Sequence, residues 1–268
     1  MRIRKAILPA GGLGTRLRPL THLMPKEMLP LGNRVVLQHV IEECDTAGLD
    51  TLLVVLNRRK TALFAVGEET PCGADPLTGV PSRSVYFANQ AEQGGLAHAM
   101  LHGEAFVGDD PFALVLGDTV IHGGESSLLG RMIAAHLEHG AAATVAAQMI
   151  PGPDISRYGV FDPIEPDPGD VFRVRRIVEK PKRAEAPSNL AVTARYVFSS
   201  EIFRACRECG TNAHGEIELT QAMTWLAENG RMVLGVRLDP AQHRLDIGNP
   251  QSYAEAFQLV AGHSDGKQ

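Results

Sequence analysis

The chain of 268 residues has little of what would mark a secreted, membrane-bound or nucleic-acid-binding protein. Four cysteines are too few for a disulfide framework at this length. Lysine and arginine total 26 against 31 acidic residues, whereas proteins that coat nucleic-acid phosphates are usually basic. No apolar run approaches the ~18–20 residues needed to span a bilayer, and the one near the N-terminus stops at Pro9, too short for a signal peptide. We expect a soluble, cytoplasmic protein that binds neither nucleic acid nor membrane.

Two common phosphate-binding motifs are also missing. No segment fits G-x-x-x-x-G-K-[ST], the motif of a Walker A loop. A dinucleotide-binding Rossmann motif needs a third glycine after Gly12 and Gly14, and Leu17 stands in its place. A dinucleotide-dependent oxidoreductase is therefore disfavoured.

Candidate zinc ligands are incomplete. Cys206 and Cys209 form one CxxC without a second pair nearby, so we expect ordinary thiols near the end of a helix. His98 and His102 have the helical spacing of metal ligands, but Ala99 stands where H-E-x-x-H requires glutamate. The sequence does not predict a zinc site.

The first 150 residues alternate between strand and helix patterns. The composition, 44% apolar and 21% charged, is that of an ordinary folded protein. Short apolar runs predict strands, and apolar residues at helical spacing predict helices. We expect strands at residues 5–8, 52–56, 85–88, 112–116 and 144–150, and helices at 35–47, 96–107 and 128–138. This alternation predicts an α/β fold, Rossmann-like with three α/β/α layers and a mainly parallel mixed sheet.

The pattern changes after residue 150. Five prolines crowd residues 151–168, which favours loops and edge hairpins over helix. Strands at 172–178, 194–198 and 232–238 and helices at 200–208, 216–228 and 253–260 are expected to follow. We interpret this part as an inserted subregion that completes a pocket. The whole chain, 1–268, then forms one domain with two halves, 1–150 and 151–268.

A glycine-rich loop follows the first predicted strand. Its glycines let backbone N–H groups approach an anion closely, and Arg16 adds a guanidinium for phosphate oxygens. Lys26 stands between Pro25 and Pro30 on what we expect to be a stiff extended segment, where it provides a second cation. These features indicate a polyphosphate site, although a glycine-rich turn without a ligand would share them.

Residues 8–16 and 25–30 resemble the sugar-phosphate nucleotidyltransferases, and the resemblance runs along almost the whole chain. It implies that Arg16 and Lys26 act on the phosphates of a nucleoside triphosphate. It also implies nucleotide contacts from the glycine loop and from a base-recognition segment, which are Ala10, Gly11, Gly12, Gly14, Thr15, Gln90 and Gly95.

The same resemblance implies a metal site and a sugar-phosphate site. Asp118 and Asp246 match the metal-binding residues, and the expected cofactor is Mg²⁺. Gly159 and Glu179 match the sugar contacts, and Lys180 matches the catalytic lysine that binds the sugar phosphate. Residues 1–150 would then bind mainly nucleotide, and the inserted, sugar-binding part in 151–268 mainly hexose 1-phosphate. Relatives are commonly dimers or tetramers, so a homo-oligomer is expected.

Within the family, four strings are most similar to bacterial UTP–glucose-1-phosphate uridylyltransferases: residues 26–30, 186–190, 215–220 and 246–248. The implied reaction joins UTP and glucose 1-phosphate into UDP-glucose, with release of pyrophosphate. Thr119 and Ala194 depart from the acidic residue and the glycine usual in that branch. A dTTP-dependent thymidylyltransferase and a non-catalytic nucleotide-sugar sensor stay open as alternatives.

Overall fold

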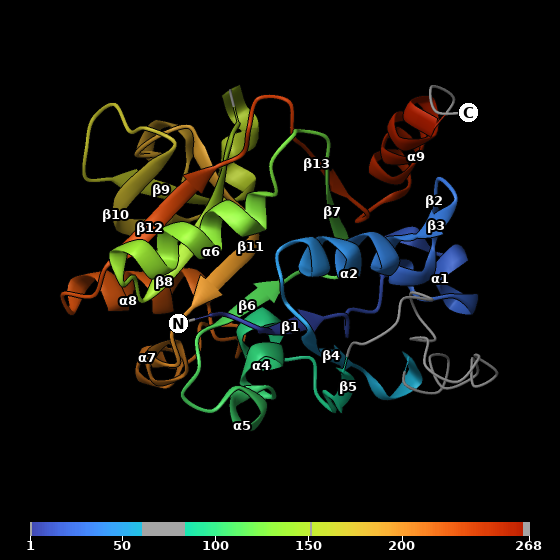
Figure 1. Ribbon diagram of the computed structural model, residues 1–268, viewed down its shortest axis with the longest axis horizontal. Helices are drawn as coiled ribbons and strands as arrows, with labels where there is room; N and C mark the ends of the chain where they lie inside the picture. Colours follow the sequence, from blue (N-terminus) through green and yellow to red (C-terminus); the bar gives the residue numbers. More distant parts are fainter. Residues whose placement is uncertain (1, 61–83, 151, 265–268) are drawn as a thin grey trace.

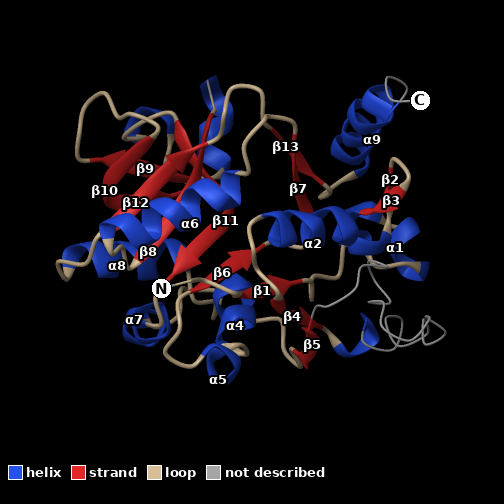
Figure 2. Ribbon diagram, viewed as in Figure 1, coloured by secondary structure: helices blue, strands red, loops and turns tan. Residues whose placement is uncertain are grey.

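The computed structural model describes residues 2–60, 84–150 and 152–264 and centres on a nine-stranded sheet (Figures 1 and 2). In sheet order the strands are β5 (Ser84–Asn89), β4 (Thr51–Leu56), β1 (Lys5–Pro9), β6 (Phe112–Val115), β11 (Leu190–Phe198), β8 (Ala143–Met149), β12 (Val233–Arg237), β10 (Val171–Glu179) and β9 (Gly159–Pro163). Only β11 and β10 run against the other strands of this sheet. The predicted mainly parallel mixed sheet is confirmed.

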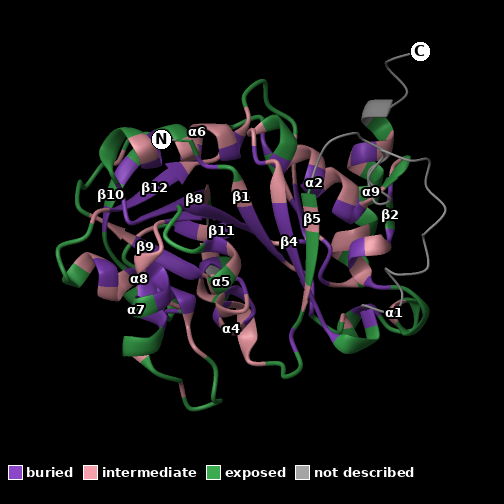
Figure 3. Ribbon diagram, turned by 60° about the horizontal axis from the view of Figure 1, so that its bottom comes forward, coloured by how far each residue is buried: buried purple, intermediate pink, exposed green. Residues whose placement is uncertain are grey.

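Helices cover both faces of the sheet. On one face lie α2 (Val36–Thr46) and α6 (Leu128–His139), and α9 (Pro250–Ser264) packs beside β13 (His243–Asp246) and β2 (Pro30–Leu31); all three contribute to one apolar core. On the other lie α4 (Gly95–Leu101), α7 (Glu201–Cys209) and α8 (Leu219–Glu228), which share the second core. The central strands are mostly buried between these layers, whereas edge strand β5 is largely exposed (Figure 3). This arrangement is the predicted α/β/α architecture.

The sheet curls where the second half of the chain enters it. Ala191 of β11 pairs with Val160 of β9 as well as with β8, so β11, β8, β12, β10 and β9 form a closed ring of pairings. A small third core of Ile155, Val160 and Ala191 lies at the closure. The ring places the ends of β9 and β10, which carry Gly159 and Glu179, beside each other.

Two small sheets complete the fold. Strands β2 (Pro30–Leu31) and β3 (Arg34–Val35) form a short hairpin before α2. Strand β7 (Thr119–His122) pairs antiparallel with β13 (His243–Asp246), which joins the first half of the chain to its last strand. Neither β7 nor β13 was predicted, because four-residue strands carry too little pattern.

The structure corrects three local predictions. The helix expected at 96–107 breaks at Gly103 into α4 and α5 (Glu104–Val107); Gly103 packs so closely on the sheet that a Cβ would lie 2.3 Å from Ile7 Cδ1. Lys26 is not in an extended segment but begins a 3-10 turn, η2 (Lys26–Met28). Residues 152–157 form another 3-10 turn, η4, while Pro151 lies outside the described residues.

The remaining helices are short: η1 (Thr15–Leu17), α1 (Leu20–Leu23) and η5 (Arg183–Glu185). None of the helices in the described ranges has both the length and the apolar character that crossing a bilayer requires.

Candidate active site

The glycine loop after β1 presents backbone donors. Within the described chain, the N–H groups of residues 11–16 donate to no backbone oxygen outside regular elements. Gly14 has φ 63°, a left-handed conformation that glycine adopts at little cost, and its carbonyl accepts from Thr21 Oγ1 at 2.8 Å. Ala10 is different, because its N–H donates to Val55 O at 2.8 Å within the sheet. The loop from Gly11 onward can therefore bind an anion, while Ala10 anchors it.

The second glycine-dependent contact lies at Gly11. A Cβ there would stand 2.9 Å from Gln90 Oε1, so glycine lets the loop approach the residue that follows β5. Asn57 Nδ2 donates to the Gly11 carbonyl at 2.6 Å and holds the loop against the end of β4. The contacts place Gln90 beside the glycine loop.

Lys26 lies over Asp118, and Nζ donates to Asp118 Oδ2. Burial works to lower the pKa of Lys26, but the carboxylates of Asp118, Glu27 and Asp246 prevail and raise it, so the ammonium stays charged. Below it, Lys60 Nζ pairs with the fully buried Glu27 Oε2 at 2.6 Å. Burial raises the pKa of Glu27 and lowers that of Lys60. Negative and positive charges therefore alternate in the series Asp118, Lys26, Glu27 and Lys60, and this series holds Lys26 in place.

A cavity of about 260 Å³ opens at this position. Its lining brings together six residues from three predicted groups, namely Gly11, Gly12, Lys26, Gln90, Gly95 and Asp118. Thr15 and Arg16 are exposed on η1 outside this lining, and Gly14 lies there with them. Four of the predicted nucleotide residues, Gly11, Gly12, Gln90 and Gly95, therefore share one cavity, and the rest of the glycine loop lies outside its lining.

Asp118 and Asp246 come together through the pairing of β7 with β13. Asp246 is opposite Thr119 in the ladder, and Ile247 N donates to Asp118 O at 3.0 Å. Asp246 lines a second cavity of about 550 Å³, which also contains Tyr158 and Arg244. The two aspartates thus lie on neighbouring strands, Asp118 in the lining of the first cavity and Asp246 in that of the second, and both carboxylates act on Lys26.

The predicted sugar-phosphate residues lie at the ends of β9 and β10. Glu179 is opposite Gly159 in the ladder, and Glu179 Oε2 accepts from Thr220 Oγ1 at 3.0 Å. A Cβ at Gly159 would lie 2.8 Å from the Thr220 side chain, which leaves room only for glycine. Lys180 Nζ stands 3.3 Å from Glu179 Oε1, and the lysine side chain is 66% exposed. Lys180 therefore projects from the ring and does not line the nucleotide cavity.

Comparison with known proteins assigns the family. The sequence profile described as Nucleotidyl transferase matches residues 5–262. The chain belongs to the nucleotidyl transferase family. It is 36% identical to the UTP–glucose-1-phosphate uridylyltransferase of Bacillus subtilis over 260 residues, 92% of this chain and 87% of that one. The enzyme of the same name from Staphylococcus epidermidis is also 36% identical, over 83% of this chain and 81% of its own.

A solved structure supports the same family. UDP-glucose pyrophosphorylase complexed with UDP-glucose matches with a TM-score of 0.86 at 29% identity, covering 97% of this chain and 99% of that one. Nucleotidyl transferases generally use divalent metal ions.

One residue of this nucleotidyl transferase that the sequence did not single out is Arg195. Its side chain is fully buried and forms a two-pronged pair with Glu43 of α2, at 2.9 and 2.6 Å. It also donates to the carbonyls of Leu116 at 3.4 Å and Thr119 at 2.8 Å, which flank Asp118. Arg195 thereby fixes the turn that carries the predicted metal ligand.

The neighbouring Ala194 stands where the family resemblance implies glycine. Its φ is 32°, in the left-handed region that costs a residue with a Cβ roughly 1–2 kcal/mol. Its carbonyl accepts from Leu116 N at 3.1 Å and from Arg195 Nη1 at 2.9 Å. These two bonds hold the strained conformation.

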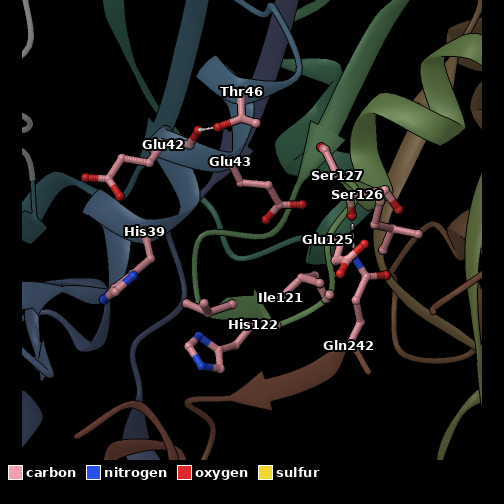
Figure 4. Close-up of a pocket in the computed structure, with 14 residues that line it drawn as sticks. His39, Glu42, Glu43, Thr46, Ile121, His122, Glu125, Ser126, Ser127 and Gln242 are labelled. Carbon is pink, nitrogen blue, oxygen red and sulfur yellow. Dashed lines mark hydrogen bonds between the residues drawn. The ribbon is translucent and has the colours of Figure 1, made fainter. Parts of the chain in front are cut away.

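Another cavity, of about 310 Å³, lies between α2 and β7 (Figure 4). His39, Glu42 and Glu43 project from α2 on one side, and Glu125 and Gln242 lie across from them (Figure 4). It shares no lining residue with the nucleotide cavity. Neither here nor elsewhere in the described ranges do three or more His, Cys, Asp or Glu side chains form a group that could hold a metal.

Proposed function

We propose that this protein is a UTP–glucose-1-phosphate uridylyltransferase, which joins UTP and glucose 1-phosphate into UDP-glucose and releases pyrophosphate. The observation that carries the proposal is the cavity that gathers Gly11, Lys26, Gln90 and Asp118 from four separate segments. The names of the relatives, which match more than four fifths of the chain, support the choice of substrates.

The glycine loop and the cavity beside it carry groups complementary to a nucleotide. The N–H groups from Gly11 to Thr15, which donate to no backbone oxygen outside regular elements in the described chain, are donors for the triphosphate, together with the cations Arg16 and Lys26. Gln90, which lies beside Gly11, and Gly95 also line the cavity and suit the polar edge of a pyrimidine. In this proposal residues 1–150 bind mainly nucleotide, and residues 151–268 mainly sugar phosphate.

The carboxylates fit a magnesium ion. Asp118 and Asp246 provide hard oxygen donors at one edge, and Lys26 already balances their charge in the structure. Two protein carboxylates with phosphate oxygens and water are a usual ligand set for Mg²⁺. When bound, the ion would neutralise charge on the phosphates during transfer. Thr119 replaces an acidic residue beside this site, and Asp118 remains on the turn that Arg195 holds through the carbonyls of Leu116 and Thr119.

The sugar phosphate needs no general base. The second pKa of a phosphate monoester is about 6, so glucose 1-phosphate is an anionic nucleophile near neutral pH. In our proposal Glu179 binds glucose hydroxyls and Gly159 leaves room for the ring. Lys180 holds the phosphate for in-line attack on the α-phosphorus of UTP, and pyrophosphate leaves past Arg16 and Lys26. The chain thus contributes positioning and positive charge.

The test is pyrophosphate release with Mg²⁺ and glucose 1-phosphate, with UTP and dTTP compared below saturation. We expect release with UTP at several times the rate with dTTP. A preference for dTTP would identify a thymidylyltransferase. Binding of UDP-glucose without release from either nucleotide would favour the non-catalytic sensor. The cytoplasmic location and the homo-oligomer stay predictions.

A further inference from the structure

The amide of Gln90 has a defined orientation. Gln90 follows β5 and is 4% exposed. Its Nε2 stands 3.4 Å from the Gly95 carbonyl and 3.0 Å from His98 Nδ1. A carbonyl can only accept, so it is the amide nitrogen and not the oxygen that must face it. Both N–H groups of the amide are then directed at acceptors, provided that His98 Nδ1 carries no proton.

His98 is itself held on two sides. A Cβ on Gly94 would lie 2.7 Å from the imidazole Cγ and Nδ1, so the ring rests against bare backbone at the start of α4. His102 stands edge-on to it, with ring centroids 4.8 Å apart, and His102 Nδ1 bonds the His98 carbonyl oxygen at 2.9 Å. The position of the Nδ1 acceptor is therefore fixed by the helix.

The opposite end of the amide lies against the glycine loop. Gln90 Oε1 is the atom that a Cβ on Gly11 would approach to 2.9 Å. Among the residues that the structure describes, none donates to it. Gln90 and Gly11 both line the nucleotide cavity. An acceptor is thus available to the nucleobase, while the donor groups are used inside the protein.

We propose that His98 is a specificity-determining positioning residue: by accepting from Gln90 Nε2, it turns Gln90 Oε1 toward the base and selects uracil or thymine over cytosine. Uracil and thymine carry an N3–H that donates to an acceptor, whereas cytosine has a lone pair at N3. In the same pose a cytosine would place acceptor against acceptor. The inference rests on the proposed function, because it takes Gln90 as a base contact.

The first test compares kcat/KM for UTP, CTP and dTTP in His98→Phe, which keeps a ring but removes the acceptor. Gln90 can then turn over, and we expect the UTP-over-CTP ratio to fall about tenfold. The UTP-over-dTTP ratio should stay within about twofold, because both bases have N3–H. His98→Gln, which restores an acceptor, should recover most of the UTP-over-CTP ratio.

His102→Phe is the matched control. It replaces the same residue type at the C-terminal end of α4, keeps an aromatic ring beside His98 and removes no contact of Gln90, so the UTP-over-CTP ratio should be unchanged. The proposal is overturned if His98→Phe leaves that ratio unchanged, or if it lowers UTP, CTP and dTTP turnover by equal factors. An equal shift in His102→Phe would also overturn it, since the effect would then come from helix packing.

A second measurement reads the unmodified chain and uses a variant only to assign its signals. In the ¹⁵N-histidine-labelled chain, the His98 ring signals are identified by their loss in His98→Gln. We expect an unprotonated Nδ1 and a protonated Nε2, and a proton on Nδ1 would overturn the proposal. If the unmodified chain transfers no nucleotide at all, the proposed function fails. The inference is then tested separately, by UTP and CTP binding in calorimetry.

Discussion

The two lysines that our proposal assigns to phosphate groups stand in opposite settings. Lys26 has a side chain only 13% exposed, pairs with Asp118, and is supported by the buried Glu27–Lys60 pair. Lys180 is 66% exposed, and its one described ionic partner is its neighbour Glu179. The nucleotide side is therefore arranged before substrate arrives, whereas the sugar side keeps a cation free to move. The ammonium group of Lys26 is thus held in a fixed position, whereas that of Lys180 can adjust its position.

Removing Asp118 should have the largest effect on activity, because it disrupts the pre-arranged nucleotide side of the site. For Asp118→Ala we expect kcat to fall by about a thousandfold or more, since a metal ligand and the partner of Lys26 are lost together. Pyrophosphate release and circular dichroism measure activity and fold. Asp110→Ala, which breaks an exposed pair with Lys5, is the control and should be active. Near-normal turnover of Asp118→Ala would exclude this residue from the mechanism.

The second-largest effect is expected at Arg195, which holds the turn that carries Asp118. Arg195→Met leaves Glu43 without its buried partner and should lower the free energy of unfolding by about 3–5 kcal/mol in urea titration. Adding Glu43→Leu removes the unpaired carboxylate, so the double variant should be more stable than Arg195→Met alone. A double variant less stable than the single one would mean that Glu43 stabilises the fold through other contacts.

The two lysines themselves give a direct comparison. Lys26→Met should lower kcat about a hundredfold, because a pre-positioned cation acts in the transition state. Lys180→Met should instead raise KM for glucose 1-phosphate about tenfold and change kcat less. Lys182→Met, at a more exposed pair nearby, serves as the baseline. The same kinetic pattern for both lysines would contradict the distinction.

The smallest of the expected effects is a difference in salt dependence between the Lys26 site and the Lys180 site. Raising the salt from about 0.1 M to 1 M shortens the Debye length from ~10 to ~3 Å, which weakens exposed charges more than buried ones. We expect KM for glucose 1-phosphate to rise by a larger factor than KM for UTP, in initial-rate measurements. An equal rise would indicate that Lys26 is no better shielded than Lys180.

The sequence predicted those helices and strands that are determined by the residues within them. Helix α2 and strands β1, β4 and β5 were found within two residues, because each carries its own apolar pattern and a clear stop. The glycine loop was singled out for a similar reason, because it follows a buried strand directly, whereas Asp118 was singled out through the family resemblance. Gly103 was misjudged, because its effect depends on Ile7 in another layer.

Features that depend on distant partners could not be predicted. Arg195 and Glu43 are 152 residues apart, and the sequence around either residue gives no sign of its partner. The pair of Glu27 and Lys60 and the ladder between β7 and β13 have the same origin. A single sequence shows which residues have chemistry to offer, but the contacts that fix their positions are set by the topology.

The ladder between β7 and β13 also constrains how the protein is made. Asp118 leaves the ribosome long before β13, so the emerging chain carries one half of its acidic pair without the other. At ~5–20 residues per second, the wait before Asp246 is synthesised lasts roughly ten seconds. Throughout that time β7 lacks its partner strand, and its neighbourhood depends on whatever else has folded or on a chaperone. The site would therefore be completed late in synthesis, so a nascent chain would gain affinity for its substrates only near the end of translation.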